Sequence, residues 1–255
     1  MIRKLGKLYF RFKGFYPVAI NDQSFKCDPY HPGFWRIVNN GGFEPQYFNV
    51  LDKYLSPESV YCDIGSWIGP TAIYASRKSK KVFCFEPDTI AYKYLLQNIQ
   101  LNKINNVQTF NMAIAGFDGT VSMASHGGNL GDSMTSMVNL DPQKDSFQAN
   151  CISWKSWLKK NNHPKIDFIK MDIEGGEFEL VVEMKDYLEE RKPIFHLSTH
   201  SLYLPEKERK IKMKKLIDTL RFYSHCYNEN HEPVTFNENL INQSLDQFRS
   251  FLFLP

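Results

Sequence analysis

Short apolar runs alternate with segments of helical periodicity from residue 60 onward, and this alternation constrains the fold more than any other feature. Strand-length apolar runs lie at 60–64, 82–85, 107–112, 166–171 and 194–198. Between the second and third run, the segment 89–101 repeats its apolar residues at the i, i+3, i+4, i+7 spacing of one helical face. Strands that alternate with helices predict a parallel sheet with crossover helices. We therefore predict an α/β fold with a doubly wound sheet and helices on both faces.

The predicted sheet domain covers residues 50–255, and residues 1–49 are predicted to form a basic helix followed by an irregular arm rich in Gly, Pro and aromatic residues. Further helices are expected at 69–77 and 206–221, a helix from the end of the 166–171 strand to about 190, and a closing strand at 248–254. The segment 116–150 is interpreted as turns with a polar, glycine-rich excursion, HGGNLGDS at 126–133. No apolar run approaches the ~18 residues of a membrane span.

A tight turn after the first strand and an acid after the second predict a cofactor that contains a nucleoside. Gly65 lets the backbone turn directly after the strand 60–64, and Gly69 permits close packing or close approach of a ligand. Exposed amides at the start of the next helix favour a carboxylate or phosphate. Glu86 follows the second strand, where a carboxylate accepts hydrogen bonds from ribose hydroxyls.

Asp63, two residues before Gly65, favours S-adenosylmethionine over NAD as that cofactor. The GxGxxG fingerprint of pyrophosphate binding is absent from the sequence. A carboxylate at the strand end repels a pyrophosphate and attracts an ammonium group such as the one at the amino-acid end of S-adenosylmethionine. A helix N-cap is the structural alternative for Asp63, and the two roles are compatible.

Several segments resemble the FkbM-type methyltransferases. They are GFEP at 42–45, DIGSWIG at 63–69, FEPD at 85–88, LLQN at 95–98 with Leu101 and Asn102, and DFIKMDIEGGE at 167–177. The resemblance spans roughly residues 41–200, and the segment 167–177 is its most specific part. It implies a Rossmann-like methyltransferase sheet and the transfer of a methyl group from S-adenosylmethionine, usually to oxygen.

The resemblance also implies a set of cofactor-binding residues. They are Glu44, Asp63, Gly65, Ser66, Trp67, Gly69, Glu86, Pro87, Asn111, Met112, Ala113 and Asp172. Ser66 and Trp67 stand where the family usually has a small residue and Asn. Trp67 is expected to lie against the sulfonium or line the pocket, or else to pack under the arm. Glu44 is expected to contact the cofactor or to order the arm.

Asp172 and His200 are the two predicted catalytic bases, because each stands at or just past the carboxyl end of a strand, where open α/β sheets bind ligands. A hydroxyl acceptor needs a nearby base to take its proton as the new bond forms. The alternative is structural, since Asp172, Glu174 and Glu177 would suit the start of a helix. Asp172, Glu174 and His200 offer ligands for a cation such as Mg²⁺, but nothing in their spacing requires one, and no metal is predicted.

The acceptor is predicted to be a sugar hydroxyl of a cell-surface glycan or its precursor. The excursion supplies His126, Asn129, Asp132 and Ser133, and the arm supplies Tyr30 and Trp35 as rings that stack on sugars. A solvated loop and a packed arm are the alternatives. With 31 Lys+Arg against 28 Asp+Glu, the net charge of +3 is too balanced to favour nucleic acid as the main partner.

The first thirteen residues carry basic side chains and no acid, with Ile2, Leu5, Tyr9 and Phe12 at helical spacing. A helix lying on an anionic membrane surface is one interpretation, and a helix docked on its own domain is the other. The 5 cysteines are widely spaced without a CxxC pair, which favours a reducing cytoplasm.

Two other functions are compatible with the sheet. An NAD-dependent oxidoreductase is disfavoured by Asp63 and by the missing third glycine. A non-catalytic relative that binds a glycan or a protein is disfavoured by the presence of both Glu86 and Asp172.

Overall fold

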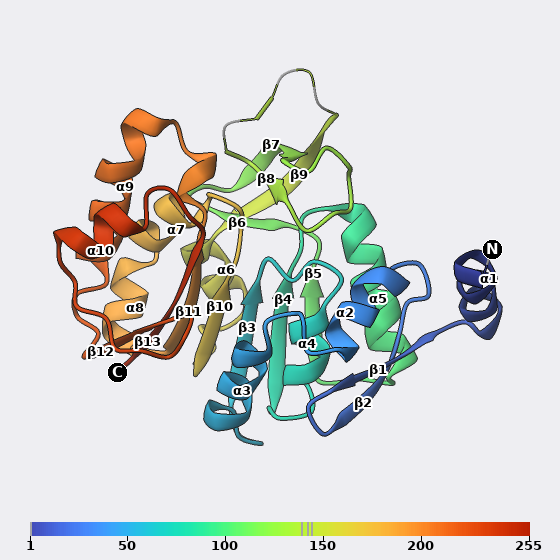
Figure 1. The fold of residues 1–255 in the computed structure, drawn as a ribbon. Helices are drawn as coiled ribbons and strands as arrows, with labels where there is room; N and C mark the ends of the chain where they lie inside the picture. Colours follow the sequence, from blue (N-terminus) through green and yellow to red (C-terminus); the bar gives the residue numbers. More distant parts are fainter. Residues whose placement is uncertain (1, 139, 142, 144) are drawn as a thin grey trace.

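The computed structural model describes residues 2–138, 140–141, 143 and 145–255, and for residues 2–5 and 7 it describes the backbone alone. Seven strands of this part of the chain form the main sheet, in the order β12-β13-β11-β10-β3-β4-β5 (Figure 1). Their bounds are β3 Val60–Ile64, β4 Lys81–Phe85, β5 Val107–Phe110, β10 Phe168–Met171, β11 Ile194–Thr199, β12 His225–Asn228 and β13 Arg249–Leu254. β10, β11, β3, β4 and β5 pair in parallel, whereas β13 is antiparallel to both of its neighbours.

Helices cover both faces of this sheet, which confirms the predicted doubly wound α/β fold. Along each strand successive side chains alternate between two hydrophobic cores, so that Tyr61 and Cys84 lie in one and Cys62 and Phe83 in the other. The first core contains α3 Pro45–Tyr54, α4 Pro70–Ala75 and α5 Thr89–Leu101. The second contains α6 Trp154–Lys160, α7 Glu177–Glu183, α8 Lys185–Arg191, α9 Glu206–Thr219 and α10 Glu238–Gln243.

The arm is more regular than predicted. It contains a hairpin of β1 Tyr16–Ile20 and β2 Gln23–Cys27, then α2 Pro32–Asn39 and α3, which crosses the expected boundary between residues 49 and 50. The buried carboxylate of Asp28 orders it by accepting hydrogen bonds from the His31 amide and from the indole of Trp35. An irregular arm was therefore the wrong prediction, because buried polar contacts fix a segment whose composition suggests loops.

The segment after β5 also forms strands, where turns were predicted. β6 Ala113–Ala115, β7 Gly119–Ser125, β8 Thr135–Ser136 and β9 Ser146–Ser153 make a second sheet in the order β6-β9-β7-β8, counted over the residues that are described. This sheet stands beyond the carboxyl ends of the main strands (Figure 1). It therefore covers the edge of the main sheet at which doubly wound folds bind ligands.

The acidic segment after β10 is a loop, and the helix begins only at Glu177. Glu174 has φ +53°, in the left-handed region, which interrupts any helix there. The predicted helix to about residue 190 is divided into α7 and α8. Asp172 and Glu174 consequently lie in the loop at the carboxyl end of β10, and only Glu177 stands at the start of a helix.

The N-terminal helix, α1 Ile2–Lys13, projects from the body of the molecule (Figure 1). Its Phe10 packs on Tyr16, with ring centroids 4.5 Å apart, while Leu8, Tyr9 and Phe12 are exposed. Among the helices of the described residues, none has the length and apolar character needed to cross a membrane.

Candidate active site

Two adjoining cavities lie where β3 and β10 end side by side. The chain runs from β3 to β4 and β5 on one side and later continues through β10 and β11 on the other, so this is the point where the strand order reverses. The first cavity is lined by β3, β4, β6, the excursion and the loop after β10. The second is wider, opens beside it and shares Gly65, Trp67, Ser133, Asp172 and Glu174 with the first.

The turn after β3 has the backbone that the sequence predicted. Gly65 has φ +86°, and a Cβ atom there would lie 1.9 Å from the main-chain oxygen of Asp172. The amides of Gly65 and Ser66 both donate to the main-chain oxygen of Phe85. Because Gly65 has no side chain, the end of β3 can lie against the end of β10, and the space where the two cavities meet stays open.

Glu86 is a buried carboxylate at the edge of the first cavity. Its oxygens accept hydrogen bonds from the amides of Asp88 and Trp67, each at 2.8 Å. Burial raises the pKa of Glu86 to about 8, against the hydrogen bonds that lower it. Each oxygen has a further lone pair, so donor hydroxyls such as those of a ribose fit this position. The remaining walls suit a flat aromatic base, since they include Phe85, Met112, Ile114, Met137 and Ile173.

The excursion closes the first cavity, and its Ser133 also lines the second. The indole of Trp67 donates to the main-chain oxygen of Gly131 at 3.0 Å, and the amide of Gly131 donates to Asp88 at 2.7 Å. Asp132 and Ser133 line the cavity as a result. Trp67 therefore lines the pocket, one of the two roles expected for it, and its ring also packs on Phe34 of the arm.

Asp63 is fully buried and lines neither cavity. It accepts a hydrogen bond from Thr71, and its other oxygen lies 3.6 Å from the amine of Lys170. Burial raises the pKa of Asp63, against the attraction of Lys170. Asp63, which was expected to bind the cofactor's ammonium group, thus already faces Lys170 on the neighbouring strand β10. The sequence analysis did not single out Lys170.

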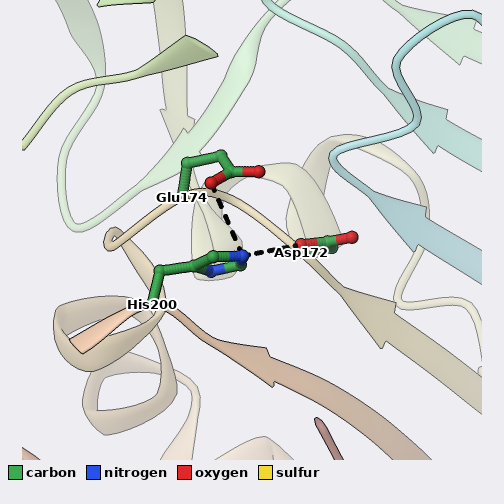
Figure 2. Close-up of side chains that lie close together, drawn as sticks. All are labelled: Asp172, Glu174 and His200. Atoms are coloured by element: carbon green, nitrogen blue, oxygen red, sulfur yellow. Dashed lines mark ion pairs between the residues drawn. The ribbon is translucent and has the colours of Figure 1, made fainter. Parts of the chain in front are cut away.

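Asp172, Glu174 and His200 converge at the boundary of the two cavities (Figure 2). His200 Nε2 lies 3.4 Å from Asp172 Oδ1 and 3.5 Å from Glu174 Oε2, and the second oxygen of Asp172 lies 3.3 Å from Lys170 Nζ. Both predicted bases are therefore in one site, with Glu174 added to them.

The electrostatics of this cluster give its members different protonation states. Although burial opposes it, the carboxylates of Glu177, Asp172 and Glu174 raise the pKa of His200 to about 9. Burial raises the pKa of Glu174 to about 8, whereas Lys170, against the effect of burial, lowers the pKa of Asp172. At neutral pH, when nothing is bound to the cluster, His200 is thus an imidazolium, Asp172 is ionised and Glu174 is mostly protonated.

Glu44 faces the second cavity from the arm. It precedes α3 with φ +40°, and its Oε2 atom is buried without a hydrogen-bond partner. Burial, followed by repulsion from Asp172, raises the pKa of Glu44 to about 7. Phe248, Arg249 and Ser250 complete the wall, where β13 begins.

Most of the predicted cofactor residues line the two cavities. They are Glu44, Gly65, Ser66, Trp67, Glu86, Pro87, Met112, Ala113 and Asp172. Asn111 instead donates to the main-chain oxygens of Glu86 and Pro87, and Gly69, with φ +85°, packs against Leu95. Asn111, Gly69 and Asp63 therefore support the residues of the cavity walls without lining the cavities themselves.

The predicted sugar-stacking rings are not in the site. Trp35 is fully buried on Asp28, and Tyr30 lies on the surface against Tyr94, so neither can stack on an acceptor in the cavities. His126 stacks on Tyr203 and, like Asn129, is not among the residues that line either cavity.

The family is decided by the match of residues 63–224 to the methyltransferase FkbM domain, which covers more than half of the chain. The chain belongs to the FkbM methyltransferase family. Residues 63–224 are thus an S-adenosylmethionine-dependent methyltransferase domain, and the first cavity, with Glu86 and its apolar walls, fits the adenosine part of that cofactor.

Other proteins share parts of this FkbM domain. A tRNA (guanine(37)-N(1))-methyltransferase of Saccharomyces cerevisiae is 33% identical over 95 residues, 37% of this chain and 18% of that protein. An uncharacterized protein of Methanocaldococcus jannaschii, MJ1452, is 33% identical over 60 residues, 24% of this chain and 23% of that protein. The chain therefore spans less than a quarter of the length of these two relatives.

Two solved structures resemble the fold at low identity. A methyltransferase FkbM from Methylobacillus flagellatus KT has a TM-score of 0.49 at 14% identity, with 99% of this chain and 59% of that chain covered. TYW2 from M. jannaschii, in complex with AdoMet, has a TM-score of 0.47 at 13% identity, with 94% and 85% covered.

Proposed function

We propose that the chain transfers the methyl group of S-adenosylmethionine to a hydroxyl of a sugar, in a cell-surface glycan or its precursor. The observation that carries the proposal is the convergence of Asp172, Glu174 and His200 between a cavity with apolar walls beside Glu86 and a wider polar one. The first cavity would hold the adenosine and the second the acceptor. S-adenosylmethionine supplies an electrophilic methyl group, and the chain must align a nucleophilic oxygen with it.

The cluster is suited to hold and deprotonate a hydroxyl. Asp172 borders both cavities, is kept ionised by Lys170, and accepts a hydrogen bond from a hydroxyl placed between them. Glu174, with its pKa of about 8, is well matched to exchange a proton near neutral pH. His200 places its Nε2 atom between Asp172 and Glu174 and so holds both carboxylates at the boundary of the two cavities.

The paired charges of the second cavity favour a neutral acceptor over a polyanion. Glu44, Asp172, Glu174 and Glu229 line it together with Lys170, His200 and Arg249. Each of these basic side chains already faces a carboxylate, so the phosphates of a nucleic acid would find no free counter-charge there. The match to tRNA methyltransferases still makes tRNA the strongest competing acceptor, and the experiment includes it.

Transfer of the tritiated methyl group of S-adenosylmethionine tests the proposal. The acceptors are neutral oligosaccharides, polyprenyl-linked sugars and, in a parallel arm, total tRNA. We expect label in a sugar ether that survives alkaline hydrolysis, with loss of at least 100-fold in Asp172→Asn and no loss in Asp22→Asn, which changes an exposed hairpin aspartate. Label in tRNA or in a small phenol, with none in sugars, contradicts the proposal.

We also propose that α1 contacts an anionic membrane surface and brings the domain to lipid-linked acceptors. Leu8, Tyr9 and Phe12 are exposed while Phe10 packs on Tyr16, so these three apolar side chains, among those of the helix that are described, are not docked on the domain. Vesicles with about 30% phosphatidylserine imitate an anionic membrane surface. We expect the parent chain to sediment with them and the variant Leu8→Glu/Phe12→Glu to lose this binding. Binding that survives this change contradicts the membrane role.

A further inference from the structure

The positions of His200, Asp172 and Glu174 fit a metal centre better than a hydrogen-bonded triad. The two distances from His200 Nε2 to carboxylate oxygens, 3.4 and 3.5 Å, exceed the 2.7–2.9 Å of a charged hydrogen bond. Ligand atoms held at about 2.1 Å from one ion lie about 3.0–3.5 Å apart. We propose that these three side chains bind a divalent transition-metal cation, a departure from the expectation of no metal.

A buried imidazole aimed at both carboxylates is the second observation. His200 is 7% exposed, its Nδ1 has no hydrogen-bond partner, and its Nε2 points between the two carboxylates (Figure 2). A metal-bound imidazole is neutral and needs only an acceptor for its other N–H, and the Oε1 atom of Glu177 stands 3.4 Å from Nδ1 for that purpose. The geometry therefore contains both the ligand and the residue that orients it.

The charges around the cluster also favour a cation. Lys170 is shared between Asp63 and Asp172, and Arg249 is paired with Glu229. Glu174 is left with the imidazole alone, and the buried Oε2 atom of Glu44 in the same cavity has no partner. A divalent ion would displace the protons held by His200 and Glu174 and would offset the carboxylates that Lys170 and Arg249 leave without a partner.

Two carboxylates and one imidazole suit Mn²⁺ or Zn²⁺ better than Mg²⁺, which prefers oxygen ligands alone. Three protein ligands leave positions open towards the second cavity. If the proposed function is correct, a sugar hydroxyl would occupy one of them and become more acidic. This role rests on the proposed function, whereas binding of the ion does not.

Calorimetric titration of the full chain with Mn²⁺, checked by electron paramagnetic resonance of the bound ion, tests the site. We expect one ion per chain, with affinity weakened at least tenfold in His200→Gln and in Glu174→Gln. The matched controls, His225→Gln on β12 and Glu58→Gln before β3, should bind as the parent does.

Each outcome of the titration is decisive. Absence of binding to a parent chain that binds S-adenosylhomocysteine overturns the metal site, as does binding that neither Glu174→Gln nor His200→Gln weakens. The circular dichroism spectrum of each variant shows that it is folded. Binding of Mn²⁺ with methyl transfer only to tRNA supports the metal and contradicts the sugar acceptor, so the two failures are distinguishable.

Discussion

The main-chain oxygen of Asp172 occupies the space in which a side chain of Gly65 would have to begin, because a Cβ atom there would lie only 1.9 Å from it. The contact joins the ends of β3 and β10, the two strands between which the cavities open. Since the obstacle is backbone, no change of rotamer relieves it.

Gly65→Ala should therefore lower both stability and cofactor binding. The left-handed backbone alone costs about 1–2 kcal/mol with a Cβ atom, and the clash adds to it. We expect a lower urea midpoint and at least tenfold weaker binding of S-adenosylhomocysteine by calorimetry. Gly33→Ala is the control, since a Cβ atom on that α2 residue meets nothing within 4 Å. Equal affinities for the two variants would show that the turn does not shape the site.

Glu86→Gln should weaken S-adenosylhomocysteine binding and change how it depends on pH. The pKa of Glu86 is raised to about 8, so the free protein holds a proton there at pH 6, and binding to the carboxylate must release it. Affinity should rise between pH 6 and 8, by at most about tenfold per pH unit, and then level off. This component should be missing in Glu86→Gln and present in Glu58→Gln; a parent whose affinity falls over that range contradicts the role.

Lys170→Met should destabilise the fold. It leaves the buried carboxylate of Asp63 without a counter-charge and Asp172 with His200 alone, and removing one partner of a buried pair costs about 3–5 kcal/mol. Adding Asp63→Asn should recover part of the loss. Urea denaturation of the parent, both single variants and the double variant measures the coupling energy, and strictly additive effects would rule out the pair.

Trp67→Phe should loosen the excursion over the first cavity while keeping the ring packing on Phe34. It removes the hydrogen bond to Gly131, worth about 1 kcal/mol, so binding of S-adenosylhomocysteine should weaken roughly fivefold. Amide hydrogen exchange of residues 126–136 should become faster. Trp35→Phe, which removes an indole bond inside the arm, should speed exchange near Asp28 and leave residues 126–136 unchanged.

The sequence pattern predicted six of the seven strands described in the main sheet and missed β12. The strand at 60–64 and the helix at 89–101 have the predicted bounds, because their apolar positions follow the periods of the structures they form. The second sheet escaped prediction because long-range pairing holds its strands, such as β6 on β9. The hairpin pairs locally, but the Gly, Pro and aromatic residues of its segment suggest loops. The local sequence pattern also does not reveal buried polar residues such as Asp28, whose hydrogen bonds order the arm.

Local motifs at the ends of successive strands were enough to predict the fold class, the family and a set of cofactor residues, most of which line the cavities. Only the folded chain sets which charges meet. It buried Asp63 on Lys170, removed Trp35 from the site, and brought Glu174 and His200, from the ends of different strands, to within 3.5 Å of each other. Electrostatic partnership acts over a few ångströms through space, and only the folded chain sets those distances.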